Sequence, residues 1–294
     1  MSDTLRQALT TALDELGVPL AGDLVLRPIG GGCINQTYRI ESGNHAYFVK
    51  VNDPDGYEMF AAEAEGLTAM RHSKSVRVPE VIALGIHANR ACLILEYIDL
   101  QPLGARSAGL LGEQLAAMHR SCAKDFGWTR DNTIGSTPQI NTRHNDWPTF
   151  WAEHRIGFQL QLAARNGYRG NLQRNGERLL TALPGLLDGH QPEPSLLHGD
   201  LWGGNCAADR EGNPVIFDPA SYYGDRECDL AMTELFGRLP GVFYEAYHAA
   251  WPIDSGYETR RDLYNLYHIL NHLNLFGGHY VHQADSIITR LLAA

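Results

Sequence analysis

The chain lacks the features of several protein classes. No run of eighteen apolar residues occurs, and the polar, amphipathic start MSDTLRQALTTALDELG lacks the apolar region of a signal peptide. Basic residues are in deficit, with 24 Lys and Arg against 34 Asp and Glu and a formal net charge of −10. A nucleic-acid-binding protein needs a basic face. We therefore expect no nucleic-acid partner, no membrane partner and a cytoplasmic location.

Cysteine is also scarce. The five cysteines are odd in number, widely spread and without a CxxC pair. This pattern argues against a disulfide framework or a zinc site and favours a reducing compartment. The rest of the composition, with 44% hydrophobic and 20% charged residues, is that of a globular protein. At 294 residues, one large domain or two lobes can form.

Strand signals are concentrated in the first third of the chain. Apolar and alternating patterns predict strands at 24–28, 36–41, 45–52, 81–85 and 91–98, with helices at 4–16 and 59–72. Beyond Asp99 nearly all predicted elements are helices, at 107–120, 147–166, 171–183, 225–235, 240–250, 258–277 and 280–293. Strands followed by helices predict an α+β fold of two lobes, a β-rich lobe over 1–98 and a mainly helical lobe over 99–294.

The most informative segment is HGDLWGGN, residues 198–205, which has the pattern H-x-D-x-x-x-x-N and is followed by Asp218. Phosphoryl transfer needs a carboxylate that orients a hydroxyl, together with an amide oxygen and a second carboxylate for Mg²⁺. We interpret Asp200 as the catalytic carboxylate and Asn205 and Asp218 as the metal ligands. Because Asp and Asn are common in turns, a purely structural role is the alternative.

The spacing between the two expected metal ligands predicts a β-hairpin. Strand-like residues 206–208 and 215–217 flank a turn-prone stretch at 209–214. If Ala208 faces Val215, then Asn205 faces Asp218 across the open end of the hairpin.

A glycine-rich turn lies between the first two predicted strands. We interpret Gly31, Gly32 and Cys33 as part of a loop whose backbone N–H groups contact nucleotide phosphates. A plain hairpin turn is the alternative. In such a loop the Cys33 thiolate would be stabilised and open to oxidation, whereas the alternative for Cys33 is a small apolar contact beneath the loop.

Lys50 ends an apolar strand and is interpreted as a ligand of the nucleotide phosphates. A lysine in this role needs a carboxylate partner, and the next helix offers Glu63 and Glu65, which cannot both face it. We favour Glu63. A solvated edge lysine is the alternative. The apolar strand at 93–98 runs into the predicted boundary, where the backbone of Glu96 and Ile98 is expected to bind adenine.

Together these segments resemble the protein-kinase-like fold, in the branch of aminoglycoside and choline phosphotransferases, which carries HGD in place of HRD. Within that branch the chain resembles the fructosamine kinase (ketosamine-3-kinase) family over almost its whole length. A small departure is Asn141-Thr142-Arg143, where a Trp often follows Asn-Thr. The resemblance is carried by GGGCIN at 30–35, FVK at 48–50, residues 60–67, GSTPQ at 135–139, LHGDLWGGN at 197–205, DPA at 218–220 and YGDRECDLAM at 223–232.

The resemblance implies an enzyme that uses Mg-ATP to phosphorylate the 3-hydroxyl of a sugar attached to an amine by glycation. The substrate would be a fructosamine or ribulosamine adduct, either free or on a glycated protein, and the phosphoester would make the adduct prone to fall apart. Asp200 would orient or deprotonate the hydroxyl. Neither the physiological substrate nor the oligomeric state follows from the sequence, and a homodimer is compatible with it.

Three further residues are candidates for substrate contacts. Trp202 offers a flat apolar face next to Asp200, although it could instead lie in the core. Asp225 could border the substrate site or cap the helix that follows it. His272 is a polar position on an apolar helix, where a structural role is the alternative. His198 and Asp229 are expected to support the loop around Asp200.

Two other functions stay open at this point. One is a kinase for a different hydroxyl substrate, such as an aminoglycoside or choline. The other is a non-catalytic nucleotide-binding regulator, against which the presence of Lys50, Asp200, Asn205 and Asp218 argues.

Overall fold

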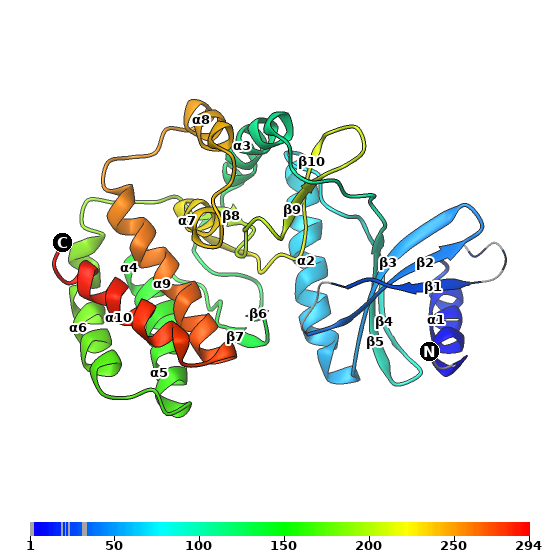
Figure 1. Cartoon of the computed structure of the whole chain (residues 1–294), viewed down its shortest axis with the longest axis horizontal. Helices are drawn as coiled ribbons and strands as arrows, with labels where there is room; N and C mark the ends of the chain where they lie inside the picture. Colours follow the sequence, from blue (N-terminus) through cyan, green and yellow to red (C-terminus); the bar gives the residue numbers. More distant parts are fainter. Residues whose placement is uncertain (1–2, 19, 21, 23, 31–33) are drawn as a thin grey trace.

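The computed structural model describes residues 3–18, 20, 22, 24–30 and 34–294. Two lobes lie side by side along the longest axis of the molecule, one rich in strands and one rich in helices (Figure 1). The elements of the first lobe are α1 (Asp3–Glu15), β1 (Val25–Pro28), β2 (Gln36–Ser42), β3 (His45–Asn52), the 3₁₀ turn η1 (Pro54–Gly56), α2 (Tyr57–Ser73), β4 (Val81–His87) and β5 (Arg90–Glu96).

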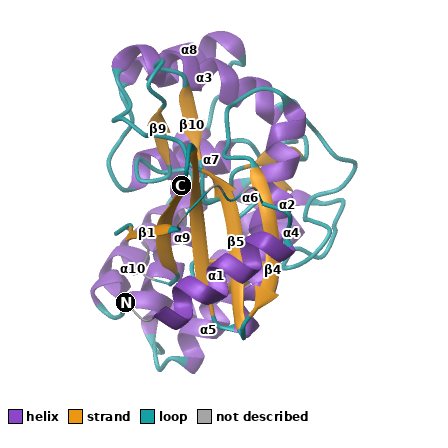
Figure 2. Cartoon of the chain, turned by 90° about the vertical axis from the view of Figure 1, so that its right-hand side faces the viewer, coloured by secondary structure: helices purple, strands orange, loops and turns teal. Residues whose placement is uncertain are grey.

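The first lobe is built on an antiparallel sheet with the strand order β1-β2-β3-β5-β4. Side chains of β5 alternate between two apolar clusters: Leu93 and Leu95 belong to one, and Cys92 and Ile94 to the other. Burial on both faces explains why this strand is an almost unbroken apolar run. Helix α1 lies across the outer face of the sheet (Figure 2).

Helix α2 covers the inner face of the sheet and joins it to the helical lobe. Phe60, Leu67 and Met70 of α2 lie in the same apolar cluster as Leu93 and Leu95, and this cluster continues into the second lobe. The helix therefore holds its polar residue Glu63 at the junction of the lobes.

The second lobe carries short hairpins among its helices. Its elements are α3 (Ala105–His119), β6 (Asn132–Ile134), β7 (Thr137–Gln139), α4 (Trp147–Trp151), the π-helical turn η2 (Ala152–Gly157), α5 (Phe158–Arg165), α6 (Asn171–Leu186), β8 (Ser195–Leu197), β9 (Cys206–Ala208), β10 (Pro214–Ile216), β11 (Tyr222–Gly224), α7 (Glu227–Leu235), α8 (Gly241–Ala250), α9 (Tyr257–Phe276) and α10 (His279–Leu291).

The predicted two-lobed α+β fold is confirmed, with one finding inside the predicted helix at 147–166. A π-helical turn separates α4 from α5 and buries the side chain of Arg155. Within the described residues, no helix is both long enough and apolar enough to span a membrane.

Candidate active site

A cavity of about 750 Å³ lies between the two lobes. Lys50 and Glu63 line it from the first lobe, and Asp200, Asn205 and Asp218 line it from the second. The residues that the sequence assigned to phosphoryl transfer therefore face one space, whose volume lies within the usual range for ligand pockets.

The loop around Asp200 is held by a buried carboxylate. Asp229 of α7 accepts the backbone N–H of His198 through Oδ2 at 2.7 Å and that of Gly199 through Oδ1 at 2.8 Å. Burial opposes the charge of Asp229, but the hydrogen bond and electrostatic interaction with His119, the electrostatic interaction with His198 and the hydrogen bond from the Gly199 backbone outweigh it and lower the pKa of Asp229. Both oxygens of this carboxylate thus fix the turn that presents Asp200.

His198 supports the loop as a neutral ring. Burial lowers its pKa. Nε2 lies 2.9 Å from the carbonyl oxygen of Phe217, and Nδ1 lies 3.2 Å from the backbone nitrogen of Asp200. A neutral tautomer protonated at Nε2 donates to the first and accepts from the second. The ring thereby ties the Asp200 loop to the segment that leads to Asp218.

Asp200 lines the cavity beside Asn205. Nδ2 of Asn205 donates to the backbone oxygen of Asp200 at 2.8 Å and to its Oδ2 at 3.2 Å. Desolvation raises the pKa of Asp200 to about 8, against the hydrogen bond from Asn205, and the charges of Asp218 and Asp229 add to the rise. A carboxyl group of this kind is suited to accept a proton from a hydroxyl.

The predicted register of the β9–β10 hairpin is wrong by one residue. Ala208 pairs with Pro214 instead of Val215. Asn205 accordingly faces Phe217, whose N–H donates to the Asn205 oxygen at 3.1 Å. The cause is a shorter turn than the sequence suggested, since Asp209 N–H donates to the Asn213 oxygen at 2.9 Å.

Asp218 therefore lies outside the paired part of the hairpin, two residues after the last strand pair, Ile216 with Cys206. Its φ of +57° turns the chain out of the strand direction. Asn205 and Asp218 both line the cavity even so. They supply an amide and a carboxylate oxygen, the hard oxygen ligands that Mg²⁺ prefers. Because Asn205 uses its nitrogen toward Asp200, its Oδ1 stays available as a ligand, and this donor set fits a magnesium ion.

Lys50 contacts two carboxylates in the cavity. Nζ lies 2.8 Å from Oε1 of Glu63 and 2.6 Å from Oδ1 of Asp218. Burial opposes the charge of Lys50, but the two carboxylates outweigh it and raise the pKa of the ammonium. Glu65, the alternative partner, is turned toward Thr129 and Arg130 at the surface.

The segment between the lobes is fixed to the β9–β10 hairpin. Gln101 N–H donates to the Ala208 oxygen at 2.7 Å, and Ala208 N–H donates to the Gln101 oxygen at 2.9 Å. Glu96 and Ile98 line the cavity, as expected for an adenine site. The Glu96 N–H donates to the backbone oxygen of Glu80 at 2.8 Å.

The structure describes the residues on either side of the glycine loop. Gly31, Gly32 and Cys33 lie outside the described residues. Gly30 and Ile34 on either side line the cavity.

Trp202 lies at the cavity and not in the core. Its side chain is 37% exposed and lines the cavity with Asp200. A Cβ on Gly204 would lie 2.3 Å from the indole ring. The glycine therefore lets the ring lie across the loop backbone, in the cavity that Asp200 also lines.

Two residues expected at the substrate site do not line the cavity. Asp225 is buried and accepts hydrogen bonds from Tyr264, from His190 at 2.6 Å and from the Glu227 N–H at 3.0 Å. It supports the start of α7, which was the alternative role. His272 donates through Nδ1 to the His268 oxygen at 2.8 Å and packs among aromatic rings.

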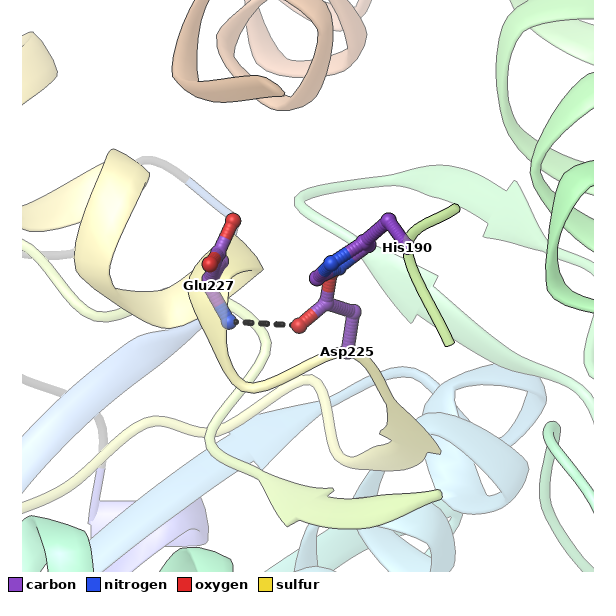
Figure 3. A group of neighbouring side chains, drawn as sticks. All are labelled: His190, Asp225 and Glu227. Carbon is purple, nitrogen blue, oxygen red and sulfur yellow. Dashed lines mark hydrogen bonds and ion pairs between the residues drawn. The ribbon is translucent and has the colours of Figure 1, made fainter. Parts of the chain in front are cut away.

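His190, Asp225 and Glu227 lie close enough to resemble a metal site (Figure 3). Each ligand atom already has a partner. Arg260 binds both oxygens of Glu227, at 2.6 and 2.9 Å, and His190 binds Asp225. A cation would have to displace this guanidinium, so the cluster is an ionic network beneath α7.

The sequence interpretation missed the amides that hold the segment after Asp218. Gln139 donates through Nε2 to the Ala220 oxygen at 3.0 Å, and Asn132 donates through Nδ2 to the Ser221 oxygen at 2.9 Å. Arg155 donates to Asn141 Oδ1 at 2.9 Å, and Asn141 donates to Asn132 at 2.7 Å. The GSTPQ segment at 135–139 could have indicated such an amide, since it contains Gln139.

Similarity to known proteins covers nearly all of these elements. Residues 21–294 match the family model described as fructosamine kinase. A "Probable ketoamine kinase" from Synechocystis is 48% identical over 267 residues, covering 90% of each chain. A chloroplastic "Protein-ribulosamine 3-kinase" from rice (subspecies indica) is 46% identical, covering 88% of this chain and 76% of that protein.

A crystal structure from Thermobifida fusca, described as a "putative fructosamine-3-kinase", superposes with a TM-score of 0.87 at 33% identity, over 98% of this chain and 99% of the other. The family match, the sequence identities and the shared two-lobed fold agree with one another. The chain belongs to the fructosamine kinase family.

Proposed function

We propose that this protein is an ATP-dependent kinase that phosphorylates the sugar 3-hydroxyl of ketosamines, the adducts formed when a sugar glycates an amine. The observation that carries the proposal is the convergence of Lys50, Asp200, Asn205 and Asp218 on one cavity. The names of the relatives from Synechocystis and rice support the choice of acceptor.

The nucleotide is proposed to bind on the first-lobe side of the cavity. Its adenine would contact the backbone of Glu96 and Ile98, and Lys50, oriented by Glu63, would contact its phosphates. Gly31, Gly32 and Cys33 are proposed to cover the phosphates. Asn205 and Asp218 would hold a magnesium ion, which neutralises phosphate charge when bound.

The acceptor hydroxyl is proposed to lie at Asp200, with the sugar against the face of Trp202. Asp200 orients the hydroxyl and takes its proton as the oxygen attacks the γ-phosphorus. The bond from the γ-phosphorus to the bridging oxygen breaks, and ADP leaves. The product is a 3-phosphoester. Loss of its phosphate by β-elimination, followed by hydrolysis of the resulting imine by water, would release the amine and so reverse the glycation.

Three further points belong to the proposal. The boundary between the lobes is placed at residues 98 and 99, which follow the end of β5. The protein is proposed to act in the cytoplasm. A homodimer is compatible with this scheme, because the scheme needs residues of one chain only.

The test is a comparison of acceptors with purified protein and Mg-ATP. ADP release is measured with a ribulosamine, a fructosamine, an aminoglycoside and choline. The proposal expects the largest kcat/KM for a ketosamine. A much faster reaction with choline or the aminoglycoside would contradict the acceptor assignment, and no reaction with any acceptor would favour a non-catalytic role.

A further inference from the structure

A row of six ring-bearing side chains extends from the cavity over the helical lobe. We call it the aromatic strip, and it consists of Trp202, Phe236, His272, Phe276, His279 and Tyr280. Ring centroids lie 6.4 Å apart for Trp202 and Phe236, 4.5 Å for Phe236 and His272, and 5.4 Å for His272 and Phe276. Tyr280 lies 5.3 Å from His272 and 4.0 Å from His279.

The strip is partly open to solvent along its length. Phe276 is 56% exposed and Trp202 is 37% exposed, while Phe236, His272 and Tyr280 are half-buried. Single exposed apolar residues are common, but contiguous aromatic surface on a globular protein marks a site of interaction.

Two contacts join the strip to the reaction site. Trp202 lines the cavity beside Asp200 and meets Phe236 edge to face. Gly135 also lines the cavity, and a Cβ at this glycine would lie 2.9 Å from Cδ1 of Leu275, the residue before Phe276. The last turn of α9 therefore packs against a residue that lines the cavity, and Phe276 follows Leu275 at the end of this helix.

The chemistry of the proposed acceptor sets how far it reaches out of the cavity. In a ketosamine on lysine, nine bonds separate the 3-hydroxyl oxygen from the lysine Cα, an extended length of about 11 Å. With the hydroxyl at Asp200 and the sugar against Trp202, the polypeptide backbone must pass beyond Trp202. Phe236, His272 and Phe276 are the rings that follow Trp202 along the strip.

We propose that the aromatic strip binds the polypeptide that flanks a glycated lysine when the acceptor is a ketosamine on a peptide or protein. This inference rests on the proposed function. The occupant is an extended peptide segment, because the strip continues the cavity from which the lysine side chain emerges. Flat rings give a peptide large contact area at a low cost in side-chain entropy.

The test compares two acceptors that carry the same sugar. One is ribulosyl-Nα-acetyl-lysine, and the other is a ten-residue peptide with ribulosyl-lysine at its centre and apolar neighbours. Phe276→Ala and Tyr280→Ala should raise KM for the peptide about three- to tenfold. KM for the single amino acid and kcat for both acceptors should stay within about twofold of the wild-type values.

Ile86→Ala is the matched control, since Ile86 is 49% exposed on β4 in the other lobe. It should change neither KM. Equal KM changes for both acceptors, or no change for either, would overturn the peptide assignment. So would a wild-type dimer that becomes monomeric in Phe276→Ala, since the strip would then join two copies. If wild-type protein phosphorylates neither acceptor, the proposed function itself fails, and this is measured first.

Discussion

The ammonium of Lys50 lies 2.6 Å from Oδ1 of Asp218, so a single buried cation joins β3 of the sheet to the segment that follows the β9–β10 hairpin. The same ammonium contacts Glu63 on α2. Strand β3, helix α2 and the segment that contains Asp218 are far apart in the sequence, and they meet at the Lys50 ammonium. Replacing any of the three side chains should disturb nucleotide use without dismantling the core, because none of them belongs to the apolar clusters.

Glu63→Gln should raise KM for ATP roughly ten- to a hundredfold, the usual cost of losing a hydrogen bond to a charged group. The reason is that Lys50 loses the carboxylate that orients it. Glu65→Gln is the control, since Glu65 contacts Thr129 and Arg130 at the surface and should leave KM near the wild-type value. Steady-state kinetics with varied ATP measure both. A larger effect from Glu65→Gln would reject the Lys50–Glu63 pair as the functional one.

Asp200→Asn should lower kcat by roughly 10² to 10⁴, because the hydroxyl loses its proton acceptor. Nucleotide affinity, measured by calorimetry, should change little. Asp218→Asn should instead weaken the use of Mg-ATP, and raising the Mg²⁺ concentration should partly restore its rate. Near-wild-type turnover in Asp200→Asn would remove Asp200 from the chemistry.

Gly199→Ala should damage the catalytic loop. Gly199 has a φ of +82°, and a Cβ there would lie 2.1 Å from the Ala220 oxygen, so the loop and the segment after Asp218 must separate. We expect a fall in both melting temperature and kcat. Gly203→Ala is the control in the same loop, since no atom lies within 4 Å of its Cβ position. Equal effects of the two substitutions would show that the close approach at Gly199 does not matter.

Asp209→Asn should destabilise the protein at neutral pH. Asp209 is buried and accepts hydrogen bonds from Arg77 and from Asn213. Burial alone would raise its pKa, but these bonds outweigh burial and lower the pKa to about 2. Loss of the charged acceptor should cost about 1–3 kcal/mol of unfolding free energy.

The pH dependence of this effect has a defined sign. The folded pKa lies below the unfolded value of about 3.9, so the stabilisation by Asp209 is complete above that value and is lost as the pH falls toward 2. Denaturant unfolding of wild type and Asp209→Asn should differ at pH 7 and converge near pH 2. A difference that grows on acidification would contradict this origin.

Local patterns predicted the elements and several of the contacts. The strand ending at Lys50 and the helix bearing Glu63 follow from apolar periodicity, and helical geometry allowed only one of Glu63 and Glu65 to face Lys50. The loop around Asp200 was predictable because its residues are adjacent in the sequence.

Features that depend on turn geometry or distant pairing were not predictable. The hairpin register was wrong because the side chain of Asp209 closes a tighter turn, in which it accepts the N–H groups of Glu211 and Asn213. Asp225 and His272 have the polarity of substrate ligands, but Tyr264 and aromatic neighbours from distant helices determine their surroundings. Residues 31–33 lie outside the described part of the chain, so the role of Cys33 stays a prediction.

The most direct test of the central claim is to locate the transferred phosphate. Ribulosyl-Nα-acetyl-lysine is incubated with Mg-ATP and the wild-type protein, and the product is examined by phosphorus–proton correlation NMR. The account predicts a phosphoester on the sugar 3-oxygen, formed by wild type and not by Asp200→Asn over the same time. A phosphate on another atom of the adduct, or equal product from Asp200→Asn, would contradict it.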